Sequence, residues 1–170
     1  DKRLTLFFEG IATWATIYVN GIIMKHNFCG YNSFEVDITD VVKFGGKKNV
    51  LAVYVDTHHH EGWWYEGAGI YRHVWLCKTD TVSVDLWGVY VVPEKRDDGD
   101  WDISIETTVR NDRYEDVELR VVSTVLDMDG NSVLTLESAG TAELREKAVL
   151  KYSSVLRNVH LWDIDDPYLY

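Results

Sequence analysis

The sequence predicts an all-β protein built as two sandwich units, and three observations support this. Strand-favouring residues are frequent and helical periodicity is scarce. Short alternating runs recur at intervals of roughly ten residues with polar turns between them, as in small β-sandwiches. Residues 1–80 hold eight Lys/Arg and nine Asp/Glu, whereas residues 81–170 hold nine and nineteen. This change of charge predicts a domain boundary close to Asp80.

Apolar runs separated by turn residues define the first unit. Strands are expected at Leu4–Glu9, Ala12–Asn20, Ile22–Met24, Phe34–Ile38 and Val50–Asp56. The dipeptide Asn20-Gly21 predicts a two-residue hairpin turn, because both of its positions must take positive φ. Thr39 or Asp40 could cap one short helical turn that extends to Phe44.

The stretch from Trp63 to Leu76 is the most unusual part of the chain. Residues 70–77 alternate with apolar side chains on both faces, so we expect a strand covered at least partly on both sides. Ahead of it, the aromatic residues Trp63, Trp64 and Tyr65 precede Glu66. Such a loop suits a sugar-binding rim, because rings pack on sugar C–H faces and a carboxylate accepts hydroxyls. The residues alone leave open a loop whose tryptophans fold onto the core.

Longer alternating runs are expected in the second unit. Strands are predicted at Val82–Leu86, continuing through Trp87-Gly88 to Pro93, and at Trp101–Val109, Val117–Val125 and Ser132–Glu137. Asp127–Gly130 is expected to be a turn. Leu144–Tyr152 fits a strand or a short helix, and we favour a strand that continues to Asn158.

Composition narrows the possible partners and redox chemistry. A net charge of -11 argues against nucleic acid or an anionic membrane as a partner. No stretch is long and apolar enough to span a bilayer. Cys29 and Cys77 do not form a disulfide framework, so we expect each to be a small buried hydrophobe, with a single bridge left open.

No catalytic or metal-binding motif stands out. Zinc could use His58-His59-His60 with Asp56 or Glu61, but metal-site spacing is lacking and a polar loop is favoured. The run Asp127–Gly130 departs from a calcium loop, because its glycine comes too early. No carboxylate pair, nucleophile elbow, phosphate loop or dinucleotide fingerprint is present. We therefore expect no cofactor, no metal and no catalytic residue in this segment.

Several runs, in this order and spacing, resemble the family 2 glycoside hydrolases, the bacterial β-galactosidases and their β-glucuronidase and β-mannosidase relatives. They are F-E-G-I-A-T-W-A-T-I-Y-V-N-G at 8–21, G-Y-N-S-F-E-V-D-I-T at 30–39, N-V-L-A-V-Y-V-D at 49–56, W-Y-E-G-A-G-I-Y-R-H-V-W-L at 64–76 and L-W-D-I-D-D-P-Y-L-Y at 161–170. The resemblance covers essentially the whole chain. It implies that residues 1–79 form the later strands of a sugar-binding (galactose-binding-like) jelly roll, and that residues 80–170 form an immunoglobulin-like sandwich.

The resemblance also implies where the chemistry resides. The acid/base and nucleophile glutamates of the family lie on a (β/α)₈ barrel, which is expected beyond Tyr170, and the first jelly-roll strands are expected before residue 1. The segment would thus be a non-catalytic part of a retaining β-galactosidase-like enzyme. Its partners would be the barrel of the same chain and, through it, a carbohydrate.

Other points stay open at this stage. A carbohydrate-binding or structural module is the alternative function, and a homo-oligomer is possible. Targeting signals would lie upstream, so a bacterial periplasmic or cytoplasmic location is undecided. Where many relatives carry Asp, Asn or Arg before the loop tryptophan, this chain has Glu61-Gly62-Trp63, so a ligand role does not transfer directly to these residues.

Overall fold

The computed structural model describes residues 2–58 and 67–170, and this part of the chain is all-β, without a helix. Consequently no helix among these residues could cross a membrane. The chain divides into two compact units, Asp1–Asp80 and Thr81–Tyr170.

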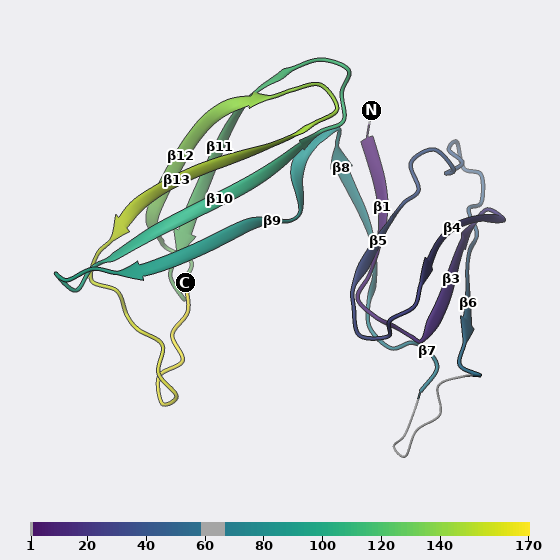
Figure 1. Cartoon of the computed structure of the whole chain (residues 1–170), viewed down its shortest axis with the longest axis horizontal. Coiled ribbons are helices and arrows are strands. Elements are labelled where there is room, and N and C mark those ends of the chain that lie inside the picture. The colour runs from purple at the N-terminus through teal and green to yellow at the C-terminus, as the bar shows by residue number, and fades with distance from the viewer. Residues whose placement is uncertain (1, 59–66) are drawn as a thin grey trace. The chain divides into compact units, whose positions relative to one another are not determined.

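Two three-stranded antiparallel sheets and a small strand pair make up the first unit (Figure 1). The sheets have the strand orders β5-β1-β8 and β4-β3-β6, and β2 pairs with β7. The strands are β1 (Lys2–Phe8), β2 (Ile11–Ala12), β3 (Trp14–Val19), β4 (Ile22–Asn27), β5 (Phe34–Asp37), β6 (Leu51–Asp56), β7 (Gly69–Ile70) and β8 (Val74–Asp80).

The core of this unit follows the two-residue period of its strands. Every second side chain points inward, because successive Cβ atoms alternate between the faces of a sheet. Phe8 of β1 and Phe34 of β5 are buried, with their rings stacked 5.0 Å apart between centroids. The buried cluster comprises Leu6, Phe8, Ile11, Ala15, Ile17, Val19, Phe34, Val36 and Ile38. The strands expected at Leu4–Glu9, Ile22–Met24, Phe34–Ile38 and Val50–Asp56 are present as β1, β4, β5 and β6.

The predicted hairpin turn is present between β3 and β4. Asn20 has φ 53° and Gly21 has φ 86°, while Val19 and Ile22 face each other across the pair. Positive φ at both central positions is what a primed two-residue turn requires. The Asn20 side chain also accepts a hydrogen bond from the Val50 backbone N–H at 3.0 Å, which ties the turn to the residue preceding β6.

Three local predictions in this unit are wrong. Residues 39–41 form a turn rather than a short helical turn, with the Val41 N–H donating to the Ile38 carbonyl at 3.1 Å. Residues 70–77 do not form one strand covered on both sides: β7 and β8 are separate, and among the described strands β8 pairs only with β1. As an edge strand it leaves Leu76 65% exposed. Cys29 and Cys77 are free and exposed, not buried.

Tyr71, between β7 and β8, makes a close contact with the chain near β2. Its hydroxyl donates to the Gly30 carbonyl at 2.6 Å. Its ring lies over Gly10, where an added Cβ would be 2.8 Å from the ring atoms. A larger residue at this position would force the Tyr71 ring to move.

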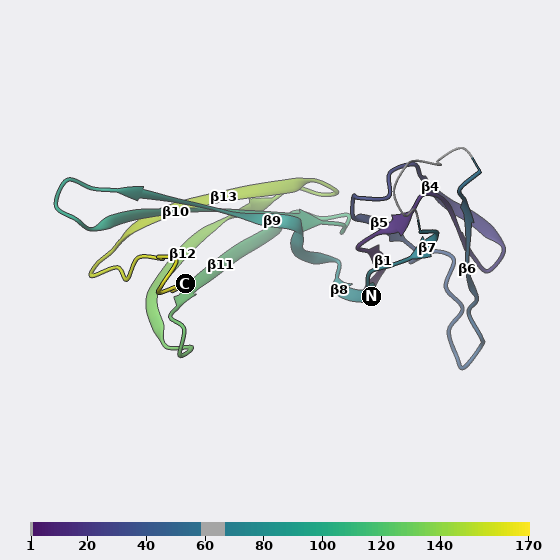
Figure 2. The same cartoon turned by 90° about the horizontal axis from the view of Figure 1, so that it is seen from below.

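A three-stranded sheet packs on a two-stranded one in the second unit (Figure 2). Their strand orders are β13-β10-β9 and β11-β12. The strands are β9 (Val82–Lys95), β10 (Trp101–Asn111), β11 (Val117–Leu126), β12 (Ser132–Ala142) and β13 (Lys147–Leu156). The predicted turn Asp127–Gly130 joins β11 to β12, and the strand favoured between Leu144 and Asn158 is present as β13.

An irregular segment interrupts the pairing of the long strand β9. Its register against β10 shifts between Thr107 and Val109, and Trp87 takes φ 56°. A Cβ at Gly88 would lie 2.7 Å from the Asp85 carbonyl oxygen and 2.8 Å from that of Thr108. Gly88, which lacks a Cβ, therefore permits a bulge within the strand predicted to continue through Trp87-Gly88.

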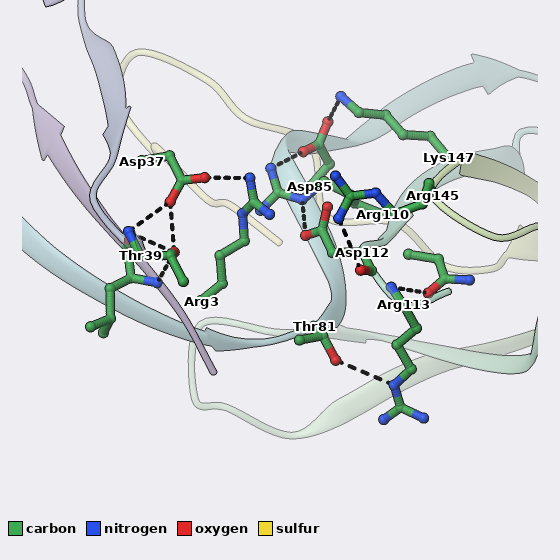
Figure 3. A network of polar contacts seen from close by, with 12 residues as sticks. Arg3, Asp37, Thr39, Thr81, Asp85, Arg110, Asp112, Arg113, Arg145 and Lys147 are labelled. Carbon is green, nitrogen blue, oxygen red and sulfur yellow. Dashed lines mark hydrogen bonds and ion pairs between the residues drawn. The ribbon is translucent and has the colours of Figure 1, made fainter. Parts of the chain in front are cut away.

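Polar groups stabilise the end of β10 (Figure 3). The guanidinium of Arg110 lies 3.5 Å from Asp85 and 3.1 Å from Asp112, and Lys147 pairs with the other oxygen of Asp85. Fully buried Asn111 donates through Nδ2 to the carbonyls of Glu115 at 2.8 Å and Ala142 at 3.1 Å. Buried polar groups need such partners, so this network fixes the loops that follow β10 and β12.

Candidate functional site

The predicted sugar-rim residues Trp63, Trp64, Tyr65 and Glu66 lie outside the described residues, as do His59, His60 and Glu61. His58 is described: its Nδ1 lies 2.8 Å from Asp56 Oδ1, and its backbone N–H donates to the same oxygen at 3.0 Å. Within residues 2–58 and 67–170, no group of three or more His, Cys, Asp or Glu side chains could hold a metal ion.

A polar and aromatic cluster on the first unit joins the end of β1 to β8. We call it the Glu9 cluster, made of Glu9, His73 and Trp75. Glu9 Oε1 accepts a hydrogen bond from the Trp75 indole N–H at 2.8 Å, and Oε2 lies 3.0 Å from His73 Nδ1. The rings of His73 and Trp75 lie 5.3 Å apart, tilted by 33°. One carboxylate therefore orients two neighbouring rings.

The strand register places this cluster on the outer face of its sheet. Leu6 and Phe8 point into the core, and Phe7 pairs with Trp75 on the opposite face. The backbone continues the pairing beyond β1, since the Glu9 N–H donates to the His73 carbonyl at 3.1 Å. The Trp75 residue is 51% exposed as a result.

The hydrogen bonds lower the pKa of Glu9 below its usual range. The largest cause is the Trp75 indole N–H, followed by His73, because both interactions favour the charged carboxylate. At neutral pH the Glu9 carboxylate is an acceptor and has no proton to donate. Glu9 can therefore accept hydrogen bonds from donors, but its carboxylate does not supply a proton for general-acid catalysis.

Three other carboxylates in the described part of the chain also have a lowered pKa. The pKa of Asp127 is lowered by hydrogen bonds from Asn131, and that of Glu137 by the Arg120 side chain. The pKa of Asp98 is lowered, chiefly by a backbone hydrogen bond from Asp100. A glycosidase acid requires the opposite shift, a raised pKa. Each of these groups is stabilised as an anion.

An apolar groove of about 650 Å³ lies on the second unit. It is lined by the inner face of β9 and β10, by β11, and by residues that follow β13, including Val91, Ile105, Val125, Trp162 and Tyr170. β9 and β11 are edge strands of their sheets, and Val89 and Val91 of β9 remain about half exposed in this groove. The lining holds no carboxylate, so this surface can bury apolar groups but has no acid for hydrolysis.

The segment after β13 is fixed at the rim of this groove by its own side chains. His160 Nε2 lies 2.6 Å from Asp166 Oδ2, and its ring stacks on Tyr168 with centroids 4.2 Å apart. The His160 backbone N–H donates to the Tyr170 hydroxyl at 2.9 Å. The sequence pattern at 161–170 does not predict that Asp166 and Tyr170 contact His160.

The Glu9 cluster was also missed from sequence. Glu9 and His73 are 64 positions apart, and only the antiparallel register of β1 with β8 brings them together. Some signal was available, because Glu9 lies where a strand passes into a loop, and binding residues are frequent on loops. The partner, however, could not have been identified.

Sequence comparison connects the chain to known hydrolases. The profile of glycosyl hydrolases family 2 matches residues 83–170. A β-galactosidase of Bacteroides ovatus is 35% identical over 170 residues, covering 99% of this chain and 20% of that protein. A β-glucuronidase of Formosa agariphila is 27% identical over 190 residues, covering 99% of this chain and 19% of that protein. The chain thus spans about a fifth of these relatives' length.

Solved structures of family 2 glycoside hydrolases are also similar to this chain. A glycosyl hydrolase family 2 member from Bacteroides cellulosilyticus superimposes with a TM-score of 0.92 at 29% identity, covering 98% of this chain and 23% of that chain. A β-glucuronidase of glycoside hydrolase family 2 gives a TM-score of 0.91 at 26% identity, with coverage of 98% and 20%.

Proposed function

Because the chain belongs to the glycosyl hydrolases family 2, we propose that it is a non-catalytic β-sandwich portion of a glycosidase that acts on β-linked sugars. The family match is the observation that carries this proposal. The first unit corresponds to part of a sugar-binding jelly roll and the second to an immunoglobulin-like sandwich. Their partner is a catalytic barrel of the same polypeptide.

The lowered pKa values of four carboxylates support an accessory role. Retaining hydrolysis needs two carboxyl groups about 5–5.5 Å apart, one of them protonated. Glu9, Asp98, Asp127 and Glu137 are all stabilised in their charged form. Such groups suit hydrogen-bond acceptance and ion pairing rather than proton donation.

A β-galactoside is our choice of substrate for the whole enzyme. The support is the β-galactosidase of Bacteroides ovatus, which is 35% identical to this chain. A β-glucuronide is the second candidate, supported by the relative from Formosa agariphila at 27% identity.

A chimera tests the accessory role. The matching segment of the Bacteroides ovatus β-galactosidase is replaced by this chain, and turnover of chromogenic β-galactoside and β-glucuronide is measured. We expect the chimera to hydrolyse the galactoside, and the 170-residue chain alone to hydrolyse neither substrate. The matched control replaces the same segment with an unrelated β-sandwich of equal length, which should give no activity.

Two outcomes would contradict the proposal. One is turnover by the purified chain alone that persists through repeated purification. The other is equal galactosidase activity in the chimera and in the unrelated-sandwich control, which would mean that this segment contributes nothing specific.

A further inference from the structure

We propose that the Glu9 cluster is a surface contact site for an uncharged sugar. The Trp75 ring would pack on the apolar C–H face of the sugar, while Glu9 and His73 would bind its hydroxyls. The choice of ligand class rests on the proposed function, and the site itself rests on the geometry of the first unit.

The Trp75 ring provides an accessible and fixed platform. It lies on the outer face of β8, and the residue is 51% exposed. Its indole N–H is held by Glu9 at 2.8 Å, and the His73 ring packs 5.3 Å away. A ring already oriented in the free protein loses little conformational freedom when a ligand stacks on it. The backbone hydrogen bond from Glu9 to His73 already joins the end of β1 to β8. The side-chain contacts of Glu9 are therefore not needed merely to connect these strands.

The polar groups beside the ring match the needs of sugar hydroxyls. An ionised carboxylate offers about four acceptor positions, and the contacts to Trp75 and His73 use two of those on Glu9. His73 Nδ1 lies 3.0 Å from Glu9 Oε2, so a neutral ring that donates to Glu9 through Nδ1 presents Nε2 as an acceptor. The His73 side chain is 73% exposed, so Nε2 is accessible to a ligand. An aromatic face with acceptors at its edge suits a ligand that is apolar on one side and rich in hydroxyls at its rim.

The charge of Glu9 sets the selectivity of this site. A uronic acid would bring a second carboxylate toward Glu9, and like charges repel at such distances. A neutral galactoside carries no such charge. The site should therefore bind a β-galactoside more tightly than the matching β-glucuronide, by about tenfold or more, which corresponds to one like-charge repulsion of ordinary strength.

The test follows the Trp75 indole directly. The full chain is labelled with ¹⁵N, the Trp75 Nε1–H resonance is assigned from its loss in Trp75→Phe, and methyl β-galactoside or methyl β-glucuronide is titrated. We expect a saturable shift of this resonance with the galactoside and a shift at least tenfold weaker in affinity with the glucuronide. Trp87, which is 77% exposed on the second unit, provides the control: Trp87→Ala should bind as the unaltered chain does.

Variants separate the parts of the site. Trp75→Ala should abolish binding, whereas Trp75→Phe should retain a weakened platform. Glu9→Gln removes the charge, and the difference between the two sugars should shrink. A folded chain whose Trp75 resonance does not respond to galactoside, or a Trp75→Ala variant that binds normally, would overturn the proposal. Neither result would bear on the chimera's activity, so this site can fail while the accessory role stands.

Discussion

The first unit encloses a cluster of nine buried apolar residues between two three-stranded sheets. The corresponding cluster of the second unit has four, and the inward face of β9 remains open to the groove. Both units have the same alternating strands, so alternation alone does not decide burial. Edge strands stay partly uncovered in both units, as Leu76 of β8 shows in the first, but only in the second does the exposed face of an edge strand line an apolar groove among the described residues. Ile105 and Val91 show this within one cross-strand pair, since the first is 4% exposed and the second 49%.

The largest loss of stability is expected from a substitution in the buried core of the first unit. Phe8→Ala should lower the free energy of unfolding by about 3–5 kcal/mol, because it removes a fully buried ring stacked on Phe34. Phe44→Ala, at a residue 69% exposed in the same unit, should change it by less than about 0.5 kcal/mol. Urea denaturation followed by circular dichroism measures both. Equal losses would show that the cluster around Phe8 does not carry the stability of this unit.

A second pair of variants tests the open side of the second unit. Ile105→Ala should cost about 2–5 kcal/mol, since the side chain is almost fully buried. Val91→Ala, opposite it, should cost less than about 1 kcal/mol because its side chain is already half-exposed. Denaturant midpoints of the two variants compare these costs. A large loss for Val91→Ala would mean that the groove is covered in solution.

A smaller loss of stability is expected from a substitution in the hairpin turn between β3 and β4. Gly21→Val should destabilise the chain by roughly 1–2 kcal/mol, because a β-branched residue tolerates a φ of 86° poorly. No atom lies within 4 Å of the position where the new Cβ would be, so this cost reflects backbone strain and not a clash. Gly30→Ala is the control, as Gly30 does not have positive φ. An unchanged denaturation midpoint for Gly21→Val would refute the primed turn.

The smallest expected effect is the loss of stability when Glu9 is protonated at low pH. Since the pKa of Glu9 is lowered on folding, its contribution to stability is fully present above the usual glutamate value of about 4.5. It should be lost as the pH falls through the lower pKa of the folded state. The Trp75 indole resonance should therefore titrate with a midpoint below 4.5. Glu9→Gln should abolish this transition, and a midpoint above 4.5 in the unaltered chain would contradict the assigned hydrogen bonds.

The sequence predicted those parts of the fold that depend on local pattern. The alternation in β10, the turn at Asn20-Gly21 and the inward face of β5 are all encoded by neighbouring residues. Strand order and edge position depend on distant pairing, so the exposure of β8 and of Cys77 was missed. The Glu9 cluster could not be predicted for the same reason. The sugar-rim hypothesis for Trp63–Glu66 stays a prediction, because these residues lie outside the described part of the chain.

The contact between Gly10 and Tyr71 has a consequence for sequence variation. A Cβ at position 10 would lie 2.8 Å from the Tyr71 ring, so position 10 cannot become larger while position 71 keeps that ring in place. A library randomised at both positions and selected for folding should return glycine wherever position 71 keeps its large ring. Larger residues at position 10 should appear only together with a small side chain at position 71. The two positions, 61 apart in the chain, thus co-vary as a single unit under selection.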